Sequence, residues 1–108
     1  MNRRIMYLRS ETGCPVGCIA INYKKGDKTL TYQVSVHHPN DKFSKPIARQ
    51  LATGRLLEKP ITVSVEPGST IHDISFSVMD HIAYTKDRSL PSRAIKCAKL
   101  WVNKNLPF

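Results

Sequence analysis

The segment LTYQVSV, residues 30–36, alternates strictly between apolar and polar side chains. Successive side chains of a β-strand point to opposite faces of a sheet, so this period of two predicts a strand with one apolar face and one polar face. The apolar side chains are Leu30, Tyr32, Val34 and Val36. A strand of this kind suits an antiparallel sheet that packs on a core with one face, and His37 falls on the polar face.

Patterns elsewhere in the chain predict further strands at residues 4–9, 16–23 and 61–65, and a polar loop around Gly26 reads as a hairpin. Apolar residues at helical spacing predict helices that begin near Ser44, Thr70 and Pro91. The sequence therefore predicts a single α+β domain over residues 1–108, with a mostly antiparallel four-stranded sheet and three helices in the order βββαβαα. The short hairpin connections favour helices on one face of that sheet.

The stretch HHPNDKFSKPIARQLATGRLL, residues 37–57, joins the predicted strand to the first helix and concentrates polar side chains. Its Pro-Asn-Asp tripeptide, residues 39–41, is typical of a turn. Ser44 is expected to be the N-cap of the helix, with Pro46 tolerated in the first turn. Helical spacing places one set of small and apolar residues on the same face, and these are Ile47, Ala48, Leu51, Ala52 and Gly54.

Arg55 falls in the middle of that apolar arc. A guanidinium there is costly unless a carboxylate, a carbonyl or a ligand phosphate accepts its hydrogen bonds. The alternative is that Gly54 ends the helix, after which Arg55 turns outward to water. The sequence leaves both arrangements open.

The charge of the chain favours an anionic partner. Seventeen lysines and arginines against eight acidic residues give a formal net charge of +9 and a pI of about 9.8. Such a balance suits a nucleic acid, a phosphorylated small molecule or an acidic protein surface. Because the positive residues are spread along the whole sequence, any basic patch must be assembled by folding.

The start of the helix near Ser44 is the predicted anion site, because its free N–H groups and positive dipole end lie beside Lys42 and Lys45. Arg49 lies one turn further on. Phe43 could stack a base, or it could pack against Ile47 as a hydrophobic staple. The predicted ligand-binding residues are Lys42, Lys45, Arg49, Arg55, His37, His38 and Phe43, and a secondary basic face on the last helix comprises Arg93, Lys96 and Lys99.

A zinc site is the first alternative use of the polar residues. Cys14 and Cys18, with His37 and His38, offer four ligands of the type that zinc prefers. The three-residue gap between the cysteines is unusual for zinc, however, and no second cysteine pair exists. The sequence therefore predicts neither a metal nor a cofactor.

A nuclease is the second alternative. His37, His38 and Asp41 could act as acid, base or metal ligands in a phosphodiester reaction, with Arg49 or Arg55 stabilising the developing charge. No second acidic cluster is present to hold catalytic metal ions. The predicted function is therefore non-enzymatic binding, and the nuclease stays as an alternative.

The cellular location is predicted from cysteine usage and hydropathy. Three cysteines cannot all pair within one chain, which suits a reducing compartment. The N-terminal residues lack the apolar core of a signal peptide, and no apolar run approaches the length of a membrane span. We expect a cytoplasmic protein without a membrane partner, and self-association stays open.

Residues 12–57 contain T-G-x-P-V-G-C, then a strand, then H-P-N-D-K-F-S-K-x-x-A-R-Q-L-A-x-G-R-L. This order resembles small accessory proteins of phages and mobile elements, in which an Asn/His-Pro-x-Asp-x-Phe turn leads into a helix that ends in Gly-Arg. The resemblance implies a role in the host cytoplasm, in DNA transactions or in countering host defence by occluding an effector or sequestering a nucleotide signal. The expected function is binding of a nucleic acid or nucleotide, and the alternative is an inhibitor that docks on an acidic or nucleic-acid-binding host protein.

Overall fold

The computed structural model describes residues 2–37, 42–85 and 90–105, with the side chain of residue 2 left out. Its elements are β1 (Asn2–Arg9), β2 (Pro15–Tyr23), β3 (Thr29–Val36), α1 (Lys45–Glu58), β4 (Ile61–Ser64), α2 (Ile71–Tyr84) and α3 (Ser92–Lys104). This order confirms the predicted βββαβαα arrangement.

The strands form one antiparallel sheet in the order β1-β2-β3-β4. The two hairpins turn at Gly13 and Gly26, whose φ values of 83° and 91° lie in the left-handed region that glycine adopts without strain. The ladder between β3 and β4 ends at the pair Tyr32↔Ile61, so the last residues of β3 extend beyond β4. At the other side of the sheet, β1 is an edge strand.

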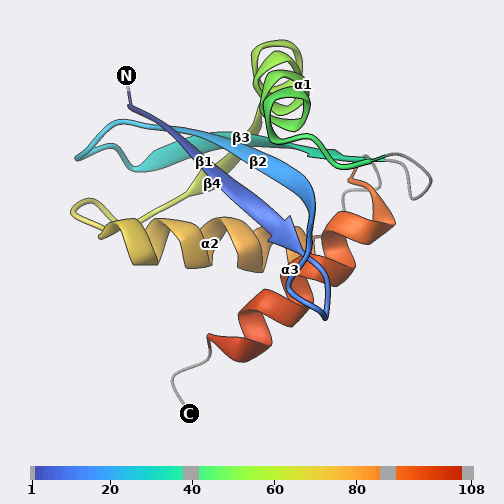
Figure 1. The fold of residues 1–108 in the computed structure, drawn as a ribbon. Helices are drawn as coiled ribbons and strands as arrows, with labels where there is room; N and C mark the ends of the chain where they lie inside the picture. The colour runs from blue at the N-terminus through green and yellow to red at the C-terminus, as the bar shows by residue number, and fades with distance from the viewer. Residues whose placement is uncertain (1, 38–41, 86–89, 106–108) are drawn as a thin grey trace.

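The helices cover both faces of the sheet, and the expectation that they share one face is wrong. In Figure 1, α1 lies on one side of the sheet and α2 and α3 lie on the other. The reason is in β2, where residues 16–21 are buried without interruption. Ile19 and Ile21 pack on the side of α2 and α3, whereas Cys18 and Ala20 pack on the side of α1. A continuous buried run of this kind is typical of a strand with both faces covered.

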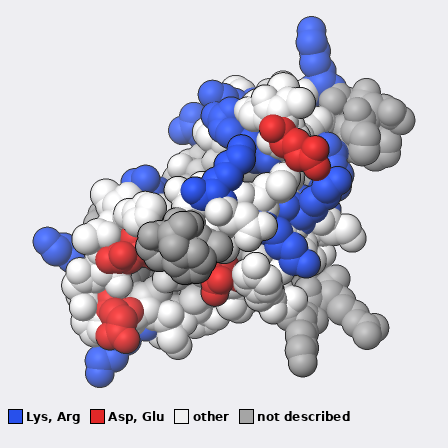
Figure 2. Space-filling model, turned by 90° about the horizontal axis from the view of Figure 1, so that it is seen from below, with Lys and Arg blue, Asp and Glu red and all other residues white. Residues whose placement is uncertain are grey.

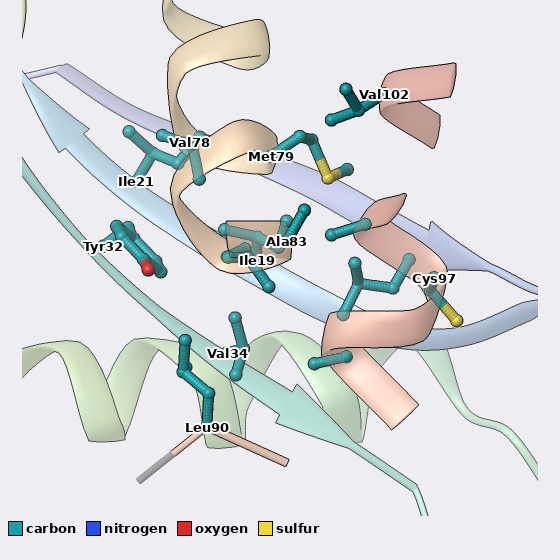
Figure 3. Close-up of a cluster of buried hydrophobic side chains, with 14 of the residues drawn as sticks. Ile19, Ile21, Tyr32, Val34, Val78, Met79, Ala83, Leu90, Cys97 and Val102 are labelled. Carbon is teal, nitrogen blue, oxygen red and sulfur yellow. The ribbon is translucent and has the colours of Figure 1, made fainter. Parts of the chain in front are cut away.

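The larger core lies between the sheet and the pair α2 and α3. Figure 3 shows Tyr32 and Ile19 from the strands opposite Val78 and Met79 from α2. The predicted apolar face of β3 is confirmed, since Leu30, Tyr32 and Val34 are buried here. Tyr32 is completely buried, and its hydroxyl lies 2.7 Å from Nδ1 of His81. It is therefore a core residue that cannot stack a ligand.

The smaller core lies between the sheet and α1. The helix buries Ala48, Ala52 and Leu56 against Cys18 and Ala20 of β2. The predicted inward positions of Ile47 and Leu51 are wrong, because these side chains are 59% and 50% exposed. Small residues on both sides let the helix backbone approach the sheet closely, and the Ser35 hydroxyl of β3 donates a 2.8 Å hydrogen bond to the Ala48 carbonyl.

The predicted start of α1 is confirmed, with Ser44 at the N-cap and Pro46 in the first turn. The alternative in which Gly54 ends this helix is wrong, since α1 continues to Glu58 and is capped by Lys59. The predicted start of α2 near Thr70 is confirmed, and a capping box forms there, with Thr70 and Asp73 bonded reciprocally. No helix in the described part of the chain is both long and apolar enough to cross a membrane.

Candidate anion-binding site

Three rings meet beside the start of α1. Phe43 lies with its ring centroid 6.3 Å from that of Tyr7 in β1 and 5.3 Å from that of His37, at steep interplanar angles. All three residues are half-buried. Phe43 packs against the small core that contains Ala48, not against the exposed Ile47 of the predicted staple. The rings form the floor of a surface that we call the β1 flank of α1.

Two cations of α1 border this floor. The Lys45 ammonium lies 5.0 Å from the centroid of the Tyr7 ring. Arg49 follows four residues later on the same side of the helix. Its positive charge acts on the Cys18 thiol of β2, where it partly offsets the effect of burial on the thiol pKa. The β1 flank of α1 therefore consists of the rings of Tyr7, Phe43 and His37 with the exposed cations Lys42, Lys45 and Arg49.

The first turn of α1 differs from that of α2 in its charges and caps. It contains no acidic residue, and Ser44 makes no side-chain capping bond to its N–H groups. In α2, by contrast, the carboxylate of Asp73 occupies the corresponding position. The free N–H groups of α1 point toward the end of the helix at which Lys42 and Lys45 lie, because backbone N–H groups point to the N-terminus.

His37 is held in a defined orientation. Its backbone N–H donates to the Val16 carbonyl at 3.1 Å, and its Nδ1 lies 2.8 Å from the same oxygen. Because a carbonyl only accepts hydrogen bonds, Nδ1 carries the proton. In the neutral form of this imidazole the lone pair lies on Nε2, for which the described residues offer no hydrogen-bond donor. The predicted partner His38 lies outside the described residues.

Arg55 lies on the other side of α1 from Lys45 and Arg49. It is exposed, and its guanidinium donates a 3.0 Å hydrogen bond to the Val34 carbonyl of β3. Val34 lies beyond the end of the β3–β4 ladder, where its N–H is also bonded by a side chain, the Gln33 amide at 2.9 Å. Arg55 thus takes the place of a strand partner at this edge. For an Arg55 in the apolar arc, the sequence predicted that a carboxylate, a carbonyl or a ligand phosphate would accept its hydrogen bonds, and the structure shows a backbone carbonyl in this role. The side chain of Arg55 is nevertheless exposed.

The secondary basic face is separated from the β1 flank of α1. Lys96 and Lys99 are exposed on α3, on the opposite side of the sheet. Figure 2 views the molecule from below and shows Lys and Arg side chains gathered mainly toward one end, with acidic side chains interspersed. Arg93 is half-buried and donates a 2.8 Å hydrogen bond to the His37 carbonyl. Arg93 therefore holds the backbone of His37, whose ring belongs to the β1 flank of α1.

The cysteines are poorly placed for the zinc alternative. Cys14 is exposed, whereas Cys18 is 0% exposed and its burial raises the pKa of the thiol to about 11. A thiol with that pKa stays protonated near neutral pH and is a weak ligand. Within residues 2–37, 42–85 and 90–105, no group of three or more His, Cys, Asp or Glu side chains is placed to share a metal ion. Asp41 of the nuclease alternative lies outside these ranges.

Burial predicts how the thiols react. In the native protein near pH 8, we expect a thiol-specific reagent to modify Cys14 rapidly and to leave Cys18 and Cys97 unmodified, because burial raises the pKa of both of these thiols. After unfolding, all three cysteines should react. The measurement is the number of reagent groups released per chain, and Cys14→Ser should remove the rapid phase. Rapid reaction at Cys18 in the native state would contradict the packing of α1 on β2.

Comparison with protein-family models, with curated proteins and with solved structures finds no match to this chain. The assignment of the site therefore depends on its own geometry. That geometry brings together Phe43, Lys45, Arg49 and His37, with Lys42 exposed directly before Phe43. It places Arg55, Lys96 and Lys99 elsewhere. It also adds Tyr7, whose position beside α1 depends on the sheet register.

Proposed function

We propose that the chain binds single-stranded nucleic acid on the β1 flank of α1. The observation that carries this proposal is the Lys45 ammonium 5.0 Å over the Tyr7 ring, with the Phe43 and His37 rings adjacent. Proteins that bind single strands combine cations that follow the phosphates with aromatic side chains on which bases stack. Both kinds of group occur together on this surface.

The cations and the rings have separate roles in the proposed complex. Lys42, Lys45 and Arg49 make no hydrogen bond or ion pair to another described residue, so their charges are available to phosphates. An exposed cation–π contact is worth about 0.5–1 kcal/mol, so a phosphate can draw the Lys45 ammonium away from the ring. The face of Tyr7 is then open to a base.

Arg3 extends the proposed path along β1. It lies four residues before Tyr7 on the same face of the strand, since alternate residues share a face. At about 3.3 Å per residue, the two positions are roughly 13 Å apart. A single-stranded nucleic acid that passes over Tyr7 can therefore also reach the cation Arg3 near the start of β1.

Binding of a single-stranded oligonucleotide over a series of salt concentrations tests the proposal. For single strands, each phosphate contact contributes about 0.7 to the slope of log K against log salt, so Lys45→Ala and Arg49→Ala should each reduce the slope by about that amount. Tyr7→Ala should weaken binding by about 1–3 kcal/mol through lost stacking and leave the slope unchanged. Fluorescence anisotropy measures both quantities.

Lys28→Ala is the matched control, because Lys28 is an exposed lysine in the loop between β2 and β3. It should leave the slope and the affinity unchanged. If Lys28→Ala reduces the slope as much as Lys45→Ala does, binding is a property of the net charge and not of this surface. Absence of any salt-dependent binding by the unmodified chain rejects the proposal.

The open edge of β1 favours a second candidate function, docking of an extended acidic segment of another protein. The hydrogen bond from the His37 N–H to the Val16 carbonyl shows that Val16 and every second residue after it in β2 direct their backbone groups to β3. The residues between them direct theirs to β1. By the alternation of antiparallel pairs, the backbone groups of Arg3, Ile5 and Tyr7 then point away from β2. A partner strand can add to this edge, and the surrounding cations favour one rich in carboxylates.

Purification in high salt separates the two candidates. A high ratio of absorbance at 260 nm to that at 280 nm, removed by nuclease treatment, favours nucleic acid. Slower amide hydrogen exchange at Ile5 and Tyr7 after addition of a partner protein, with no nucleic acid present, favours docking at the edge.

A further inference from the structure

A pocket of about 500 Å³ lies between the start of β1, the end of β2 and the start of α2. Its apolar part is formed by Ile21, Ile74 and the ring of Tyr23. These side chains belong to the face of the sheet that packs on α2, so the pocket lies on the opposite face from the Lys45 and Tyr7 contact. Its size falls within the range of about 300–1,000 Å³ that is typical of small-molecule sites.

Arg3, Arg4 and Lys25 line this pocket, and no carboxylate does. Four other surface pockets of the described chain each include at least one carboxylate in their lining. The three cations make no hydrogen bond or ion pair to another described residue. Positive charge at a concave surface whose lining includes no carboxylate favours an anionic ligand.

The wall of the pocket includes a large apolar side chain that is exposed to solvent. Ile71 lines it and is 59% exposed, although Ile21 and Ile74 beside it are almost completely buried. The Tyr23 hydroxyl is buried and has no hydrogen-bond partner within the described residues. An apolar ring placed against Ile71 would cover this exposed side chain, at a gain of about 25 cal/mol for each Å² removed from water.

The cations, and not the end of α2, account for the preference for an anion. Thr70 also lines the pocket, but its backbone N–H already donates to the Asp73 carboxylate at 3.0 Å. That carboxylate at the helix start disfavours a second negative charge there. The anionic group of a ligand is therefore expected on the side of Arg4, which shares the pocket's face of β1, and the apolar group on the side of Ile71.

We propose that this pocket binds a nucleoside monophosphate, with the phosphate at Arg4 and Lys25 and the base against Ile71. The ligand class follows from the pairing of an apolar wall with unpaired cations in a pocket of this size. The inference does not depend on single-stranded binding at the β1 flank of α1. A free nucleotide and the terminal nucleotide of a strand share this chemistry.

Titration calorimetry with adenosine monophosphate, adenosine and inorganic phosphate tests the pocket. We expect the monophosphate to bind saturably and at least tenfold more tightly than adenosine or phosphate alone. Arg4→Ala and Ile71→Ser should each weaken it at least tenfold while circular dichroism stays unchanged. Tyr84→Ser is the control for Ile71, because Tyr84 is a 60% exposed apolar side chain at the far end of the same helix. Lys28→Ala is the control for the cations.

The variants also separate this site from the proposed nucleic-acid surface. Lys45→Ala should leave the affinity for the monophosphate unchanged, and a loss there would assign the binding to the β1 flank of α1. Competition by a 5′-phosphorylated oligonucleotide that requires Arg4 would identify the terminal nucleotide of a strand as ligand, and its absence would identify the free nucleotide. Binding of the monophosphate no tighter than inorganic phosphate, or equal loss in the control variants, overturns the proposal.

Discussion

Replacing Gly17 with alanine is expected to lower the free energy of unfolding by about 3 kcal/mol, at the upper end of the usual cost of overpacking. Gly17 lies in β2 between Leu8 of β1 and Val36 of β3. A Cβ at this position would lie 2.5 Å from the Ser35 carbonyl oxygen and 3.3 Å from a methyl carbon of each neighbour. The carbonyl belongs to the backbone of the next strand, so the clash is relieved only by moving β3 away from β2.

Gly54→Ala provides the matched control for this change, because a Cβ at Gly54 in α1 meets nothing within 4 Å. Alanine is favoured over glycine inside a helix by about 0.8–1 kcal/mol, so this variant should be more stable than the unmodified chain. Urea denaturation followed by circular dichroism measures both effects. A Gly17→Ala variant as stable as the unmodified chain would show that the spacing of β2 and β3 is wrong.

The sheet was predictable because alternation is a local property of the sequence. The apolar residues Leu30, Tyr32 and Val34 define the core face of β3 without reference to any other element. The placement of helices on both faces of the sheet was harder to predict from the sequence. Whether β2 is covered on one face or both depends on the side from which α1 packs. The signal for coverage of both faces was the uninterrupted run of small and apolar residues VGCIAI at positions 16–21.

The orientation of α1 could not be obtained from the size of its apolar residues. Of the predicted face, Ala48 and Ala52 are buried against the small residues of β2, whereas the larger Ile47 and Leu51 are exposed. In the observed orientation of α1, Arg55 lies at the side of the helix that faces the end of β3, where the Val34 carbonyl accepts its hydrogen bond. The periodic pattern thus predicted that a helix forms here, but it did not predict which of the helix's apolar side chains are buried.

Part of the candidate site was also predictable. The turn before Ser44 and the cations near it indicated where α1 begins and where positive charge gathers. Tyr7 could not be assigned to this site from the sequence, because it is 36 positions before Phe43 and reaches it only through the pairing of β1 with β2. Arg93 reaches His37 from a helix on the opposite face.

Ala52→Leu is expected to cost about 2–3 kcal/mol of stability, because a larger side chain must be accommodated between α1 and β2. Ala52 is 0% exposed and packs in the small core with Cys18 and Ala20. The replacement should also push α1 away from the sheet and separate Lys45 from the Tyr7 ring. If single-stranded nucleic acid binds there, its affinity should fall together with the stability.

Leu51→Ala tests the same interface from the neighbouring position. Leu51 is 50% exposed, and surface substitutions usually change stability by less than about 0.5 kcal/mol, so this variant should be nearly as stable as the unmodified chain. Thermal and urea denaturation of the two variants give the comparison. The ordering of their effects decides which face of α1 is buried, because a helix with the opposite orientation would tolerate leucine at Ala52 and lose stability at Leu51. In a helix with that other orientation, Lys45 and Arg49 would not face β1. The surface proposed to bind nucleic acid would then not exist.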